Sequence, residues 1–329
     1  MTVETVGDKG EFQCIKEITH DLNYRKGTLK VGIGDDAAVY TTPKGYDQLI
    51  STDTMVEGIH FTKDTMAAFD VGYRICMVNF SDMAAMGGEP QGLVISLALP
   101  SDLPFSWLTA CYDGIREACR SYEVNLLGGD MTGSMQGVIL TGTVIGLVPE
   151  NKAICRSGSQ VGDVVFVTGT LGDSATGLSV IQSAEDEKYP YLAKRHRRPT
   201  ARVAWGKILR AYGVTALNDI SDGLSREIKE IAVAGNVDIR LYKEYIPLSD
   251  EIQKWAKDTG QDPYEKALHG GEDYELVGTI SKENWDKLNK EIPVTAIGEV
   301  VQKGSGRITI IDGKKEMELP VSAYEHFKK

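Results

Sequence analysis

The chain has 329 residues, of which 42% are hydrophobic and 25% charged, as in a globular protein of about two domains. Its formal net charge of -11 argues against a nucleic-acid partner, because phosphate backbones attract basic surfaces. The polar, acidic start of the chain and the lack of an apolar run of about 18 residues predict neither a signal peptide nor a membrane span. Five cysteines without a C-x-x-C pair predict reduced thiols in a cytoplasmic protein.

The first part of the chain is predicted to form a helix over residues 11–24, followed by neighbouring strands over 31–41 and 48–54. Both strands carry acids near one end: Asp35 and Asp36 in the first, and Asp53 in the second. Oxygen ligands without nearby His or Cys suit Mg²⁺, which usually serves phosphates. Two turns with solvated acids are the alternative interpretation.

A glycine pattern at Gly32, Gly34 and Ala37 superficially matches the dinucleotide-binding fingerprint. That fingerprint requires a helix to begin at its second glycine, whereas β-like residues and a turn follow here. We therefore reject a Rossmann domain. A Walker A sequence is also absent, so any ATP must be held by other means.

Residues 65–87 are predicted to be helical, with Asn79 and Asp82 three apart on one otherwise apolar face. A buried Asp is costly unless it is paired or bound to a metal. An N-cap or an internal hydrogen bond is the alternative role for these two residues.

The rest of the first half is predicted as a strand over 92–99, a helix over 106–122 with Ser106 as a possible cap, and strands over 125–129 and 136–148. The strand over 125–129 ends at Gly129 and Asp130, a further acid at a strand end. Residues 149–152 have the composition of a boundary, which predicts domains over 1–150 and 151–329.

The second half is predicted to contain a glycine loop, 169–175, that opens a helix capped by Asp173 or Ser174. Such a loop can hold a phosphate or be an ordinary capped turn. The basic cluster over 194–198, taken alone, has the composition of a solvated surface run. The other predicted strands are 163–168, 214–220, 239–242, a segment reaching 280, 294–300 and 308–311, and the predicted helices are 200–212, 224–234 and 249–259.

Acids thus recur at strand ends or on one helix face. They are Asp35, Asp36, Asp53, Asp82, Asp130, Asp219 and Asp222. Clustered carboxylates raise each other's pKa and need cations to ionise together. Several Mg²⁺ ions that bridge them to a polyphosphate would relieve the repulsion, and phosphoryl transfer needs mainly alignment and charge neutralisation. The residues therefore indicate a metal- and ATP-dependent phosphotransferase.

The sequence also resembles a known family, the thiamine-monophosphate kinases. The likeness is carried by motifs in the expected order from residue 11 to residue 327: GIGDDAA (32–38), STDTMVEGIHF (51–61), NFSDMAAMG (79–87), GGDMT (128–132), RSG (156–158), RHRRP (195–199) and GGEDYEL (270–276). It implies the two-domain α/β (α+β) fold shared with aminoimidazole ribonucleotide synthetase. In that fold the N-terminal sheet pairs across a homodimer, and a C-terminal α/β domain covers the cleft.

The resemblance implies direct transfer of the γ-phosphate of ATP to thiamine monophosphate. It also implies roles for individual residues. Metal ligands would be Asp36, Ser51, Thr52, Asp53, Asp82, Asp130, Asp219 and Asp222. ATP would contact Tyr112, Gly129, Asp130, Arg156 and Ser221, and the thiamine end would contact His60, Glu272 and Tyr324. No side chain would need to act as a strong base, because the attacking phosphate oxygen is already ionised.

Two alternatives stay open at this point. One is another ATP-using enzyme of the same superfamily; a selenophosphate synthetase would be expected to carry a reactive Cys near the N-terminus, whereas Cys14 lies within a helical pattern. The other is a non-catalytic sensor of ATP or thiamine phosphate. Such a sensor would be marked by loss of the expected acids.

The sequence departs from the family pattern at Ala323, before Tyr324, where the family usually has Gly.

Overall fold

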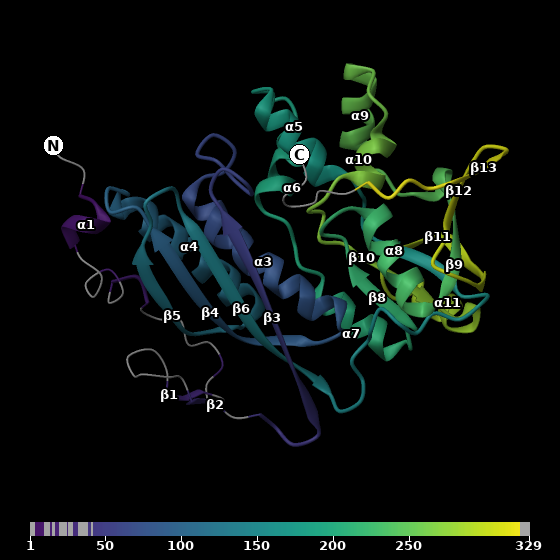
Figure 1. Ribbon diagram of the computed structural model, residues 1–329, viewed down its shortest axis with the longest axis horizontal. Coiled ribbons are helices and arrows are strands. Elements are labelled where there is room, and N and C mark those ends of the chain that lie inside the picture. The colour runs from purple at the N-terminus through teal and green to yellow at the C-terminus, as the bar shows by residue number, and fades with distance from the viewer. Residues whose placement is uncertain are drawn as a thin grey trace. The chain divides into compact units, whose positions relative to one another are not determined.

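The structure is a computed structural model that describes residues 42–322 and, before them, residues 4–9, 14, 17–19, 25, 29–31 and 39–40. The chain divides into two compact units (Figure 1). The first comprises residues 1–83 and 88–151, and the second comprises residues 84–87 and 152–329. This mixed α/β architecture in two parts agrees with the predicted fold class.

The first unit is built on a four-stranded sheet with the strand order β3-β6-β4-β5. Its strands are β3 (Tyr46–Val56), β4 (Glu89–Leu99), β5 (Asn125–Gly133) and β6 (Ile139–Pro149). β6 pairs antiparallel with both β3 and β4, whereas β4 and β5 are parallel. β5 extends to Gly133, so the expectation that this strand ends at Gly129 was wrong: Asp130 lies inside the strand.

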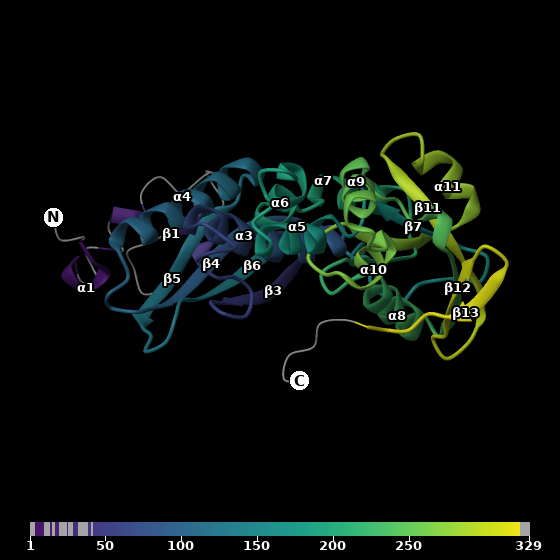
Figure 2. The same ribbon diagram turned by 90° about the horizontal axis from the view of Figure 1, so that it is seen from above.

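Two helices, α3 (Ala68–Ala85) and α4 (Phe105–Tyr122), cover one face of this sheet (Figures 1 and 2). Glycines allow the close approach. A Cβ atom at Gly142 would overlap Nδ2 of Asn79, and one at Gly114 would overlap the carbonyl oxygen of Phe69. Glycine within β6 is therefore explained by the helix that lies on it. α4 lacks the expected Ser106 cap, since Pro104 occupies the N-cap position and no side chain caps the helix.

The expected strand over residues 31–41 is wrong as a single element. β1 (Leu29–Val31) and β2 (Val39–Tyr40) instead pair with each other as an antiparallel two-stranded sheet. This sheet is separate from the one that contains β3, so, within the described residues, β1 and β2 are not neighbours of β3. A short helix, α1 (Val6–Lys9), precedes them, and the predicted helix over 11–24 lies mostly outside the described residues.

The second unit contains a seven-stranded mixed sheet with the order β13-β12-β9-β11-β7-β10-β8. Only the β12–β9 pair is parallel among its described pairings. The strands are β7 (Val164–Thr168), β8 (Ala216–Asp219), β9 (Val237–Tyr242), β10 (Leu276–Ile280), β11 (Val294–Lys303), β12 (Ile308–Asp312) and β13 (Lys315–Glu318).

The helices of this unit cover the central strands on both faces. Ile228 and Ile231 of α8 pack in one core with Val165 and Val167 of β7. Phe166, which alternates with these valines, contacts the ring of Trp285 in α11 at 6.0 Å between centroids. The helices are α5 (Asp173–Gln182), α6 (Pro190–Arg197), α7 (Val203–Ala211), α8 (Leu224–Gly235), the 3-10 helix η1 (Lys243–Tyr245), α9 (Asp250–Thr259), α10 (Pro263–His269) and α11 (Lys282–Leu288).

Candidate active site

In the first unit, α3 and β3 bring together two of the predicted ligand residues. The hydroxyl of Ser51 donates a short hydrogen bond to Oδ2 of Asp82. Asp53 lies two residues further along the same strand and is therefore on the same face, opposite Gly142 of β6. Asp82 is half-buried, while Asn79, one turn earlier in α3, is fully buried and donates to the carbonyl of Ile75. The expected shared helix face is thus present, and it carries both the internal hydrogen bond and the candidate ligand.

Thr52 points to the other face of the sheet. Its hydroxyl donates to the carbonyl of Gly142 at 2.8 Å and lies 3.0 Å from the hydroxyl of Thr143. Because alternate residues of a strand face opposite sides, the Thr52 side chain is separated from those of Ser51 and Asp53. Thr52 can therefore join them in a ligand set only through its main-chain carbonyl.

Asp130 is an exposed residue of the edge strand β5, next to the exposed Gly129. The register pairs Asp130 with Ser96 and pairs Ser96 with Thr141. Asp53 pairs with Gly142, the residue that follows Thr141 in β6, and successive residues of a strand face opposite sides of the sheet. The fold of this unit therefore does not bring Asp130 to the helix-covered face where Ser51 and Asp82 meet.

His60 lies in the turn after β3 and is half-exposed. Its Nδ1 accepts a hydrogen bond from the Val56 amide at 3.1 Å. This contact makes Nε2 the ring nitrogen that carries the proton in the neutral form.

Tyr112, the predicted nucleotide contact on α4, is buried, with 5% of its surface exposed. Burial raises the pKa of its phenol, and the neighbouring Cys111, Cys76 and Cys119 thiols add to the rise. In this conformation Tyr112 is part of the helix packing, and only a small part of it reaches the surface.

In the second unit, the predicted phosphate contact and the predicted metal ligands share a polar network. Nε of Arg156 donates to Oδ1 of Asn218 at 3.0 Å, and the Asn218 amide donates to Oε2 of Glu227 at 2.5 Å. The other Glu227 oxygen accepts from the Asp222 amide at 3.1 Å and from the Ser221 hydroxyl at 3.4 Å. One carboxylate thus braces the loop that carries Ser221 and Asp222.

Glu227 is 4% exposed, and Asp219 ends β8 with 5% of its surface exposed. Burial, followed by the nearby Asp219 charge, raises the pKa of Glu227 to about 7. Sequence reasoning missed both Asn218 and Glu227. The available signal was a polar residue on each side of the 219–222 acid motif, Asn218 in an apolar strand and Glu227 in the first turn of α8, but such residues are usually assigned to a solvent face.

The segment that carries Glu272 has an unusual backbone. Glu272 and Tyr274 adopt positive φ values of 70° and 52°, which are uncommon for residues with side chains. The segment is held by hydrogen bonds from the Glu272 amide to the Ser221 carbonyl at 2.6 Å and from the Tyr274 amide to the Ile220 carbonyl at 2.9 Å. It therefore runs directly beside the 219–222 motif, so the predicted thiamine contact and the predicted metal loop lie together.

The glycine loop before α5 is an ordinary capped turn, but its cap differs from the expected one. Gly172 is the N-cap residue, and the capping carboxylate comes from Asp273. It accepts from the amides of Gly172 at 2.6 Å and Ser174 at 3.0 Å. Asp173 instead accepts from the Ser249 and Thr170 hydroxyls. A carboxylate of the chain therefore occupies the place where a phosphate would bind.

The basic cluster over 194–198 is only in part the solvated surface run that its composition suggested, because Arg195 and His196 point inward. Arg195 is only 12% exposed and binds the buried Glu275 carboxylate at 3.0 Å. Arg202, just before α7, holds the same carboxylate through two hydrogen bonds, at 2.7 and 2.5 Å. His196 is also buried. Arg195 and Arg202 therefore neutralise the interior carboxylate of Glu275, whereas Lys194 and Arg198 are exposed.

Two of the predicted site residues, Asp36 and Tyr324, lie outside the described residues. Their roles stay predictions.

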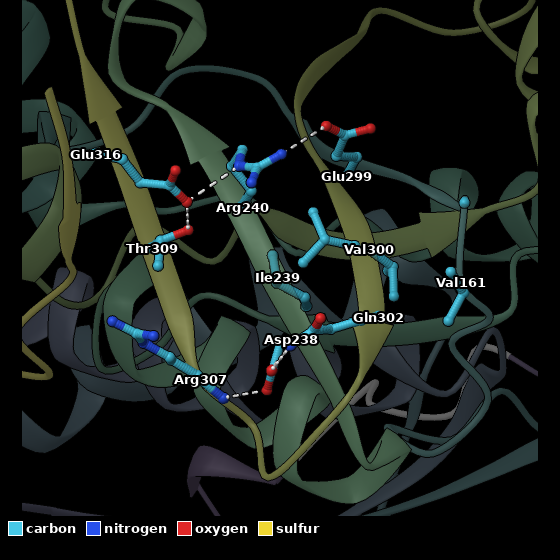
Figure 3. Close-up of a pocket in the computed structure, with 12 residues that line it drawn as sticks. Val161, Asp238, Ile239, Arg240, Glu299, Val300, Gln302, Arg307, Thr309 and Glu316 are labelled. Carbon is cyan, nitrogen blue, oxygen red and sulfur yellow. Dashed lines mark hydrogen bonds and ion pairs between the residues drawn. The ribbon is translucent and has the colours of Figure 1, made fainter. Parts of the chain in front are cut away.

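A pocket of about 480 Å³ lies elsewhere, on the sheet of the second unit (Figure 3). Arg240 lies between Glu299 and Glu316, at 3.5 and 3.2 Å, and Asp238 accepts from the Arg307 amide at 2.9 Å (Figure 3). Its charged groups thus neutralise one another. The pocket lining, as far as the described chain shows it, includes none of the predicted site residues.

The described part of the chain contains no group of three His, Cys, Asp or Glu side chains close enough to hold a metal by themselves. The candidate ligand atoms that do lie together, such as those of the Ser51 hydroxyl and the Asp82 carboxylate, are oxygens. Mg²⁺ typically uses one or two carboxylates and completes its shell with substrate phosphates and water. The donor chemistry therefore fits Mg²⁺, with the substrates as part of the ligand set.

Comparison with known proteins decides the family. Two family models match, "AIR synthase related protein, N-terminal domain" over residues 34–148 and the corresponding C-terminal domain over residues 160–311. The chain is 38% identical to the thiamine-monophosphate kinase of Bacillus subtilis across 97% of this chain and 99% of that protein. The chain belongs to the thiamine-monophosphate kinase family. The Escherichia coli member is 36% identical across 97% of this chain and 98% of its own length.

Solved structures of the family agree with the fold. The thiamine-monophosphate kinase of Stenotrophomonas maltophilia superposes with a TM-score of 0.82 at 31% identity, covering 90% of this chain and 95% of that one. A structure of AaThiL complexed with AMPPCP and TMP has a TM-score of 0.79 at 34% identity and covers 99% of this chain and 100% of that one. Among the described residues of this chain, no helix is long and apolar enough to cross a membrane.

Proposed function

We propose that this protein transfers the γ-phosphate of ATP to thiamine monophosphate, giving thiamine diphosphate and ADP. The observation that carries the proposal is membership of the thiamine-monophosphate kinase family over nearly the whole chain. The structural likeness to AaThiL complexed with AMPPCP and TMP supports the same pair of substrates.

The proposal includes Mg²⁺ as the cation of the reaction. In the first unit, Ser51, Asp53 and Asp82 would hold it on the helix-covered face, and Thr52 would add its main-chain carbonyl. When bound, Mg²⁺ shields the phosphate charges and helps to align them. In the second unit, Asp219 and Asp222 are the further proposed metal ligands. Asp36 is a further proposed ligand of this set, and Asp130, on the opposite face of the sheet, would bind a separate ion beside the nucleotide.

The nucleotide and the thiamine end would be held by different residues. Arg156 is the proposed phosphate contact, and its exposed guanidinium keeps donors available beyond the one held by Asn218. Ser221, Gly129 and Tyr112 are further proposed contacts of ATP. His60, Glu272 and Tyr324 would bind thiamine, with the Glu272 carboxylate opposite the cationic thiazolium and Tyr324 offering an aromatic face.

The chemistry needs no strong base from the protein, because the attacking oxygen belongs to an ionised phosphate. At an effective dielectric constant of ~20, two unit charges ~4 Å apart repel by roughly 4 kcal/mol. The proposed task of the chain is to offset this repulsion with Arg156 and the bound cations and to fix the two phosphates in line.

The proposed division of labour assigns ATP, Mg²⁺ and dimer contacts to residues 1–150 and completion of the active site to residues 151–329. A homodimer would use the face of the first sheet opposite α3 and α4. That face carries Ile50, which is 71% exposed, and the paired hydroxyls of Thr54 and Thr141.

A cytoplasmic location is part of the proposal. The five cysteines, all within the described residues, form no disulfide, which supports it.

A chromatographic assay with Mg-ATP and either thiamine or thiamine monophosphate tests the function. We expect thiamine diphosphate from the monophosphate alone, with an equal amount of ADP and no turnover after EDTA treatment. ADP without thiamine diphosphate would instead favour another enzyme of the superfamily. Binding of both ligands without any ADP would favour a sensor.

A further inference from the structure

His196 lies directly behind Glu272 in the second unit. It belongs to α6 and is buried, with a 2% exposed side chain, whereas the Glu272 side chain is 30% exposed. The imidazole Nδ1 lies 3.9 Å from Oε2 of Glu272 and 3.3 Å from the hydroxyl of Ser174. The Glu272 carboxylate thus reaches solvent on one side and meets a buried ring on the other.

The ring is fixed by the packing of its helix. α6 lies so close to α5 that a Cβ atom at Gly177 would overlap the Leu192 carbonyl and lie 3.0 Å from Cβ of His196. Ser174 is fixed in turn, because its amide is bound by the buried carboxylate of Asp273 at 3.0 Å. The imidazole and the neighbouring Ser174 are therefore each held in place by packed or capped helices.

Glu272 itself needs such support. Its backbone has φ of 70°, a conformation that costs energy for a residue with a side chain. Its amide is tied to Ser221, but the long side chain retains several rotatable bonds. A neighbour that limits these rotamers would reduce the entropy lost when the carboxylate meets a cationic ligand.

We propose that His196 is a positioning residue that orients the Glu272 carboxylate toward the thiazolium cation of thiamine monophosphate. This inference rests on the proposed function. The pair sets the affinity for the cationic end of the substrate and acts little on the phosphates. Ser174 assists by holding the Nδ1 edge of the ring.

The test is a double-mutant cycle read as steady-state constants for both substrates. We expect H196A to raise the KM for thiamine monophosphate about tenfold, with kcat and the KM for ATP changed less than about twofold. H196N places an amide near the Nδ1 position and should recover most of the affinity. In an E272Q background H196A should add little, because the charge that it orients is already gone. K194A changes an exposed residue of the same helix and is the matched control.

A second probe separates orientation from general damage. An analogue in which a neutral thiophene replaces the thiazolium should bind the parent and H196A about equally. If H196A does not fold, S174A replaces it in the test, because it removes one contact of the ring and leaves His196 in place. S174A should raise the KM for thiamine monophosphate by less than the tenfold expected for H196A. Equal losses for ATP and thiamine monophosphate, or an undiminished H196A effect in the E272Q background, would overturn the inference. Failure of the proposed function is distinct, because the parent itself would then form no thiamine diphosphate.

Discussion

The side-chain amide of Asn218 lies 2.5 Å from the carboxylate of Glu227. The same Asn218 accepts from Arg156, so a single buried amide joins the exposed guanidinium to the carboxylate that braces Ser221 and Asp222. Neither Asn218 nor Glu227 is a proposed contact of a substrate. Their effect on phosphoryl transfer would be exerted through the residues that they hold.

Replacement of Asn218 by Leu should weaken ATP binding. Leu has a similar size but removes both hydrogen bonds, which leaves Arg156 less restrained and the buried Glu227 with one partner fewer. We expect the KM for ATP to rise roughly tenfold, equivalent to about 1.4 kcal/mol, with little change for thiamine monophosphate. E230Q is the control, because Glu230 reaches Arg156 only at 4.0 Å on the surface. Equal KM values for N218L and the parent would contradict a role for this network.

Asn substitutions at Asp53 and Asp82 should reduce turnover without unfolding the protein. Each removes a negative charge from the proposed Mg²⁺ ligands while it keeps the size of the side chain. We expect kcat to fall by roughly 10²–10³-fold, comparable to the loss of one strong charge-stabilising group in other enzymes. D64N, an exposed acid of the same unit, should be neutral. Near-normal turnover in a folded D53N or D82N protein would remove that residue from the ligand set.

How far the sequence determines this structure depends on the kind of element. Strands and helices with clear periodicity were predicted close to their observed positions, as for α9, which was expected over 249–259 and is observed over Asp250–Thr259. Short elements were missed: α10, α11 and β13 have too few residues to show a period. β1 and β2 were predicted as one strand, because strands of three and two residues are too short to show a period of their own.

For the candidate site, the sequence predicted relations within one element but not relations between elements. Local spacing correctly placed Asn79 and Asp82 on one helix face, because that relation depends on the helix alone. It could not show that Thr52 and Asp130 face away from Asp53, since this depends on the register of β3, β6, β4 and β5. Nor could it show that Asp273, distant in sequence, caps α5. The basic composition around Arg195 suggested solvent for a similar reason, because its acid partner, Glu275, lies on another element.

The close approach of α3 and α4 predicts that G114A destabilises the first unit. A methyl group there would overlap the Phe69 carbonyl oxygen, so the helices must separate. Overpacking of this kind typically costs about 1–3 kcal/mol, which exceeds the gain in helix propensity of up to about 1 kcal/mol. Urea denaturation measures the change. G133A is the control, because a Cβ atom at Gly133 has no neighbour within 4 Å, and it should leave the midpoint nearly unchanged.

The buried cap of α5 predicts a dependence of stability on pH. Burial raises the pKa of Asp273 from 3.8 to about 7, although the Gly172 and Ser174 amides and Arg195 oppose the rise. Between these two pH values the folded state holds a proton that the unfolded state has released. The contribution of Asp273 to the free energy of unfolding is therefore largest at low pH and is lost as the pH rises through about 7.

D273N should remove this dependence. At pH 5 the variant is expected to be less stable than the parent, because an Asn side chain presents only one acceptor to the two amides that Asp273 binds. As the pH rises to 8 the difference should shrink by about 2–3 kcal/mol, since only the parent loses the proton-linked contribution. Asp173, whose pKa burial also raises, interacts with the Asp273 charge, so its titration contributes to the difference between the two proteins. The measurement is the free energy of unfolding in urea at pH 5, 6, 7 and 8. A constant difference across this range would mean that the Gly172 and Ser174 amides and Arg195 keep Asp273 ionised despite its burial.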